Sequence, residues 1–158
     1  MFFRIARPAD LYRWRSLPSI DRRRLIRAAL RLLSIDLRLR LRGFAAVAAQ
    51  VRPPAAEGAG EGSIASWVRA VDVAARHHLY PMTCVPRALA LRSLLAEEGV
   101  ATEIRIGVRK EGGRLAAHAW LEHRGTPIGE SESVGERFAS LVPVAQVEEE
   151  KATRGAFC

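Results

Sequence analysis

Apolar residues between Ser19 and Gly99 recur every three or four positions, the spacing of helices with one buried face. The first such stretch runs from Ser19, a suitable N-cap, to Phe44, with Gly43 as the expected stop. It predicts one long helix or two short ones. Its apolar positions are Leu25, Ala29, Leu32, Leu33 and Leu37.

A second helix is expected after the Pro- and Gly-rich stretch 53–62, which reads as a flexible loop. Ser63 is its N-cap, and it runs to about Leu79, where Tyr80 and Pro81 end it. The residues expected to face the core are Ile64, Trp67, Val68, Val71, Ala74 and Ala75.

A third helix begins near Thr83, which can cap it, and carries Cys84 in its first turn. Pro86 is tolerated there because the first N–H groups of a helix have no partner within it. Gly99 is a suitable C-terminal glycine. The predicted buried face consists of Ala88, Leu89, Leu91, Leu94 and Leu95.

Beyond the third helix the apolar pattern changes to the alternation of strands. Residues 104–108 and 115–122 read as two strands joined by a turn at 111–113, and 127–130 reads as a short third strand after a turn at 123–126. Strands joined by such short turns pair antiparallel. Helices followed by a small antiparallel sheet indicate an α+β domain.

With 158 residues, about half of them apolar, the chain can bury one ordinary core. We divide it into a basic helical segment (1–52) packed on the core, the loop 53–62, a core (63–145) and an acidic or polar tail (146–158). Near the tail, we expect edge packing from Phe138, Leu141, Val142 and Val144 and solvated side chains from Glu148 to Lys151.

The formal net charge of +8 resides in the first segment, where thirteen arginines stand against Asp10, Asp21 and Asp36. Eight of these arginines lie between Arg22 and Arg42, enough to occupy several helix faces. Such a segment is either a solvated helix surface or a docking surface for an acidic partner, nucleic acid or anionic lipid. Charge alone does not choose among these.

No uncharged apolar run is long enough to span a membrane, and the first residues lack the apolar centre of a signal peptide. We therefore expect a cytoplasmic protein without a transmembrane segment. Its two cysteines are Cys84 and the last residue, Cys158. A structural disulfide between them is not expected, which leaves Cys84 available for chemistry.

Cys84 is the candidate nucleophile. A thiol acts as a nucleophile when it ionises, and the unpaired N–H groups at a helix start favour the anion. The same N–H groups can stabilise the oxyanion formed during acyl transfer. The alternative is a small buried apolar residue, the commoner role of an unpaired cysteine.

His118 is the candidate base. Period two places His118, Trp120 and Glu122 on one strand face, while the small residues beside the histidine permit close approach of another element. Glu130 lies across one hairpin and is expected nearly opposite His118, where its carboxylate can accept the second ring N–H. Glu132 competes for this role, and both acids also read as exposed turn residues.

Other polar residues make weaker candidates. His77 and His78 are adjacent, so their side chains diverge and cannot face one metal, and we expect no metal and no cofactor. His123 is expected to be solvated. Ser131 and Ser133 lack a glycine-framed nucleophile turn, which disfavours a serine hydrolase.

Four stretches of the chain share a pattern with one known family: the run from Cys84 to Leu95, the strand Ile104 to Arg109, His118-Ala-Trp-Leu-Glu and Gly125-Thr-Pro-Ile-Gly-Glu130. Together they resemble the stand-alone leader peptidases of lasso-peptide biosynthesis. The resemblance covers about residues 63–145. It implies a transglutaminase-like, papain-like α+β core with a Cys84–His118–Glu130 triad. Many family members have Asp where this chain has Glu130.

The resemblance also implies the reaction and its partners. The protein would remove the leader from a ribosomally made precursor peptide through an acyl-enzyme, together with a small leader-binding protein and upstream of an ATP-dependent macrocyclase. The arginine-rich segment, or apolar residues beside it, would dock that partner or an acidic leader. A transglutaminase or amidase using the same triad, and a non-catalytic basic module that binds nucleic acid or membrane, are the alternatives.

Overall fold

The computed structural model describes residues 19–51, 60–78, 80–130 and 133–141. The expectations for Cys158, Ser131, Glu132 and the tail beyond Leu141 lie outside these residues. None of the helices within the described ranges is both long and apolar enough to cross a membrane.

Three helices precede the sheet: α2 (Ser19–Gln50), α3 (Ile64–Arg76) and α4 (Cys84–Glu97). A short 3₁₀ turn, Gly60–Ser63, leads into α3, so the last residues of the predicted loop are ordered into this turn. Ser63 occupies the N-cap position of α3 and Thr83 that of α4. Gly99, with a φ of 79°, follows the end of α4 as the glycine pattern indicates.

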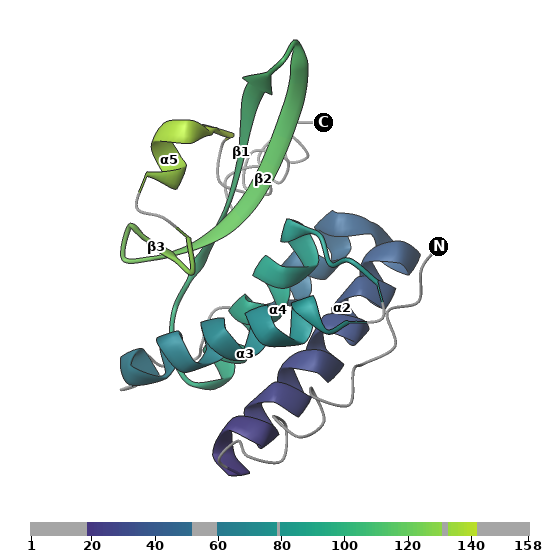
Figure 1. Ribbon diagram of the computed structural model, residues 1–158, viewed down its shortest axis with the longest axis vertical. Helices are drawn as coiled ribbons and strands as arrows, with labels where there is room; N and C mark the ends of the chain where they lie inside the picture. The colour runs from purple at the N-terminus through teal and green to yellow at the C-terminus, as the bar shows by residue number, and fades with distance from the viewer. Residues whose placement is uncertain (1–18, 52–59, 79, 131–132, 142–158) are drawn as a thin grey trace, which may run out of the picture.

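The sheet has four antiparallel strands in the order β3-β2-β1-β4. Strands β1 (Glu103–Glu111) and β2 (Arg114–His123) form a long hairpin that reaches beyond the helices (Figure 1). Strand β3 (Thr126–Ile128) pairs with β2, and a short helix, α5 (Val134–Arg137), leads into β4 (Ala139–Leu141). The predicted α+β class is confirmed.

The helices and one face of the sheet share a single hydrophobic core. Trp67 of α3, Leu32 of α2 and Leu89 of α4 are fully buried within it. The sheet contributes Ile104, Ala119, Leu121 and Ile128. On the opposite side of β2, Trp120 packs with Val134 and Phe138 in a smaller cluster. Successive side chains of β2 point to opposite faces of the sheet, so residues on both faces of this strand are buried.

Three boundaries differ from the prediction. Gly43 does not stop α2 but kinks it, since its φ of 76° and ψ of 172° are non-helical and the helix resumes as far as Gln50. Helix α3 ends at Arg76 rather than near Leu79. The third strand ends at Ile128, so Glu130 lies beyond the strand and not on it.

The apolar residues of α2 occupy two faces, which the spacing alone did not separate. Leu25 and Leu32 are buried as expected. Leu33 and Leu37 belong to an opposite, solvent-exposed face.

Candidate active site

Cys84 is the first residue of α4 and is a free, partly buried cysteine. Thr83 before it is extended, with a φ of −76° and a ψ of 173°, and no hydrogen bond from its side chain caps the helix. The first N–H groups of α4 have no hydrogen-bond partner within the helix, and the side chain of Thr83 supplies none. The predicted position at a helix start is confirmed.

His118 lies on β2 directly opposite Gly107 of β1. Its imidazole stacks on Trp120, with ring centroids 6.1 Å apart, and lies 5.2 Å from the ring of Phe138. A Cβ on Gly107 would lie 2.8 Å from the Cβ of Phe138 and 2.9 Å from the indole of Trp120. The missing side chain at Gly107 thus makes room for the aromatic packing that holds His118.

Glu130 reaches His118 because the chain leaves the sheet at the preceding residue. Gly129 has a φ of 69°, a conformation that favours glycine, and a Cβ there would lie 3.0 Å from Val68. Beyond this point Glu130 is no longer paired in the ladder. Its Oε1 lies 2.9 Å from Nε2 of His118.

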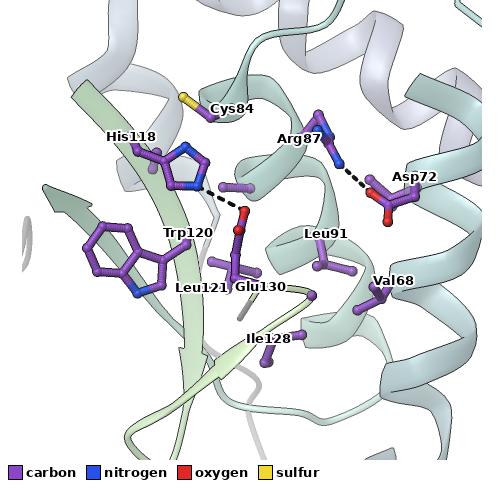
Figure 2. A pocket seen from close by; sticks show the side chains of 14 residues that line it. Val68, Asp72, Cys84, Arg87, Leu91, His118, Trp120, Leu121, Ile128 and Glu130 are labelled. Carbon is purple, nitrogen blue, oxygen red and sulfur yellow. Dashed lines mark hydrogen bonds and ion pairs between the residues drawn. The ribbon is translucent and has the colours of Figure 1, made fainter. Parts of the chain in front are cut away.

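All three predicted residues, Cys84, His118 and Glu130, line one pocket. In Figure 2 the other ring nitrogen of His118 lies on the side of the ring toward the Cys84 sulfur. Because a carboxylate only accepts hydrogen bonds, contact with Glu130 places the proton on Nε2 and leaves Nδ1 with its lone pair. The arrangement can accept a proton from a thiol.

The opposite wall of this pocket carries an ion pair between Asp72 of α3 and Arg87 of α4 (Figure 2). The apolar lining comes from Val68, Val71, Ala88, Leu91, Leu121 and Ile128. The cavity measures about 50 Å³, well below the ~300–1,000 Å³ of typical small-molecule sites. It has room for one small side chain, so a larger substrate must lie across its mouth.

A polar network ties the segment before Cys84 to α2. The hydroxyl of Tyr80 donates to Oδ2 of Asp36 at 2.5 Å, and Nε of Arg40 donates to the same oxygen at 2.7 Å. Burial alone would raise the pKa of Asp36, but these hydrogen bonds outweigh it and lower that pKa below its ordinary value. His78 packs edge-on against Tyr80, and burial lowers the pKa of its imidazole.

The remaining histidines lie away from the pocket. His123 was predicted to be solvated, but it is partly buried and its Nδ1 donates to the carbonyl oxygen of Ala101 at 2.7 Å. His77 is exposed just beyond α3. Across the described ranges no three His, Cys, Asp or Glu side chains gather as ligands for a metal.

Sequence reasoning missed several contributors to the site. Period two placed Trp120 on the face of His118, but its packing against Phe138 depends on α5 and β4, which have no strong local pattern. Gly107 and the pair Asp72–Arg87 carried no signal that distinguished them from ordinary strand and surface residues. Tyr80 was predicted only to end a helix.

Comparison with protein families matches the transglutaminase-like superfamily over residues 29–143. This range includes Cys84, His118 and Glu130, and it begins within α2. Neither the curated proteins nor the solved structures gave a match.

Proposed function

We propose that this chain, which belongs to the transglutaminase-like superfamily, is a cysteine peptidase that removes the leader from a ribosomally made lasso-peptide precursor. The superfamily includes cysteine peptidases and acyltransferases, and both form a thioester intermediate. We choose a leader peptidase among these activities because residues 63–145 resemble lasso leader peptidases.

One observation carries the proposal: Cys84, His118 and Glu130 line the same pocket, and Glu130 contacts Nε2 of His118, while the other ring nitrogen lies on the side toward the Cys84 sulfur (Figure 2). A nucleophile, a base and a group that orients the base are the minimum set for acyl transfer through a thiol. They come from three separate parts of the fold, the start of α4, strand β2 and the turn after β3, so finding them together is more informative than any one residue alone.

In the proposed reaction, Nδ1 of His118 takes the proton of the Cys84 thiol, and the thiolate attacks the carbonyl carbon of the last leader residue. Amide groups at the start of α4 stabilise the oxyanion. The imidazolium then gives its proton to the departing amine, which is the N-terminus of the core peptide. Water, deprotonated by His118, hydrolyses the thioester and releases the leader with a free carboxylate.

The shallow cavity suits a peptide that lies extended across its mouth and places one small side chain inside. The proposed partners are the precursor peptide and a small leader-binding protein that presents it. An ATP-dependent macrocyclase would then take the released core peptide. No cofactor takes part in this scheme.

The first test is cleavage of a synthetic lasso-peptide precursor in the presence of a leader-binding protein. We expect two fragments by mass spectrometry, and Cys84→Ala or His118→Ala to lower the rate by at least about a thousandfold. Circular dichroism should show both variants folded, because both side chains border a pocket. Full activity of folded Cys84→Ala would exclude thiol catalysis.

A second measurement separates the peptidase from an acyltransferase. The same reaction is run with an added primary amine, and the products are weighed. A peptidase gives the free carboxylate of the leader, whereas a transferase gives an amide adduct of the leader or of a glutamine side chain. Adducts as the main product would replace the peptidase with a transglutaminase or amidase.

A further inference from the structure

The exposed face of α2 carries a row of large apolar side chains. Ile26, Leu30, Leu33, Leu37 and Leu41 follow one another every three or four residues and are between 44% and 75% exposed. They lie opposite the core-facing row of the same helix, which includes Leu25 and Leu32. We call these five residues the leucine stripe. Contiguous apolar surface of this kind marks an interaction site in soluble proteins.

The leucine stripe is hollowed rather than flat. Leu30, Leu33, Leu37 and Leu41 line a groove of about 480 Å³ together with Gln50. Gln50 comes from the part of α2 that follows the kink at Gly43, so the kink supplies one wall of the groove. A groove receives protruding side chains, whereas a membrane surface requires a helix face that lies flat on it.

The rim of the groove is basic. Arg38 and Arg42 line it, and no described carboxylate forms an ion pair with either. Within the same helix, Arg27 and Arg31 are already paired with Glu97 and Arg40 with Asp36. The rim therefore presents positive charge that only another molecule or another part of the chain can balance.

We propose that the leucine stripe docks an amphipathic helix of a partner polypeptide, with apolar residues every three or four positions and Asp or Glu along both edges. Nucleic acid does not suit the groove, because its contacts are mostly to phosphates and leave five apolar side chains unmatched. A second copy of this chain docked through the same face would add the same two arginines and no carboxylate to balance them, since no described Asp or Glu lines the groove. The stripe lines no part of the Cys84 pocket, so the inference does not depend on the proposed reaction.

The test uses a synthetic, fluorescently labelled helical peptide with leucines at this spacing and glutamates on both edges. A matched peptide has lysine in place of each glutamate. Fluorescence anisotropy with the full chain is expected to show saturable binding of the glutamate peptide and none of the lysine peptide. Equal binding of both peptides, or of neither, would refute the proposal.

Substitutions locate the binding. Leu37→Ser is expected to weaken binding of the glutamate peptide at least about tenfold, because the peptide would no longer cover a leucine side chain there. Leu115→Ser is the matched control, since Leu115 is 76% exposed on β2, away from α2. Arg38→Glu with Arg42→Glu should also weaken binding, and Arg114→Glu should not. Equal losses in controls and stripe variants would show that binding occurs elsewhere.

Other occupants give different results. If this chain covers its own stripe, Leu37→Ser lowers the melting temperature by several degrees and the peptide does not bind. If two copies pair there, sedimentation shows a dimer that Leu37→Ser abolishes. If a membrane is the target, the chain binds vesicles of phosphatidylcholine and phosphatidylglycerol, Leu37→Ser abolishes that binding, and the glutamate peptide does not bind. Each of these outcomes would overturn the proposal.

Discussion

At the scale of single residues, Glu130 determines what His118 can do. Its contact with Nε2 places the ring proton on the side away from Cys84, and it holds the imidazole in one orientation. Neither group is deeply buried, with 25% of the His118 side chain and 30% of the Glu130 side chain exposed. The value of the contact therefore lies in orientation more than in stability.

We expect Glu130→Gln to lower the rate of peptide cleavage by about a hundredfold or more, because an amide can present its N–H₂ group to the ring and favour the wrong tautomer. Glu130→Asp keeps the carboxylate but shortens it, and should retain more activity than Glu130→Gln. Single-turnover cleavage rates of the two variants test this order. If Glu130→Gln cleaves at the wild-type rate, Glu130 does not orient His118, and Glu132 becomes the candidate for that role.

Gly107 gives a second prediction at this scale. Gly107→Ala places a methyl group against Trp120 and Phe138, and the displaced rings should shift His118. We expect a loss of about 1–3 kcal/mol in unfolding free energy and a fall in cleavage rate. Gly135→Ala is the control, since nothing lies within 4 Å of a Cβ there. Wild-type activity and stability of Gly107→Ala would show that Trp120 and Phe138 can move aside without loss of unfolding free energy or displacement of His118.

At the scale of elements, the connection from α3 to α4 positions the cysteine. Tyr80 lies four residues before Cys84 and is bonded to Asp36 of α2, so the N-terminal helix helps to fix the start of α4. The lowered pKa of Asp36 means that the folded protein binds its proton less readily than the unfolded chain does. The network therefore stabilises the fold above the ordinary carboxyl range, near pH 4, and this contribution is lost as the pH falls further.

The corresponding prediction concerns stability against pH. Asp36→Asn should lower the unfolding free energy at neutral pH by about 1 kcal/mol or more and flatten its decline in acid. Glu111→Gln is the surface control, because the Glu111 side chain is 64% exposed. Urea unfolding across a pH series provides the measurement. Parallel acid declines in Asp36→Asn and the wild type would show that other carboxyl groups govern the acid response.

At the scale of the whole molecule, the basic helix and the sheet depend on one core. Leu32 of α2 is fully buried in the same cluster as Leu89 of α4 and Leu121 of β2. The family match from residue 29 to 143 likewise begins inside α2. The first described helix is therefore an integral part of the fold.

Leu32→Ala should lower the unfolding free energy by about 2–5 kcal/mol in one cooperative transition. Leu41→Ala, in the same helix but 75% exposed, should change it little. Helical circular dichroism and tryptophan fluorescence, followed through urea unfolding, should give coincident curves. Separate transitions for the two signals would indicate that α2 unfolds independently of the sheet.

Local patterns were sufficient for the order of the three helices and the first three strands, and for the candidate nucleophile and base, but not for α5 and β4. Helix caps, Gly99 and the turns of the β1–β2 hairpin depend on neighbouring residues, so their positions follow from short stretches of sequence. The sequence also supplied Glu130 as an orienting acid, although its place beyond β3 was not predicted. That place depends on the exit at Gly129, which packs against Val68 of another element.

By itself, then, the sequence determined the α+β class, the cysteine at a helix start and the histidine on the second strand, because spacing of three to four or of two residues reflects backbone geometry. Only the tertiary structure decided which leucines of α2 are buried, since two apolar faces have the same spacing. It also brought Phe138 to His118 and Tyr80 to Asp36. Such contacts join residues distant along the chain, and they form only when helices and sheet pack together.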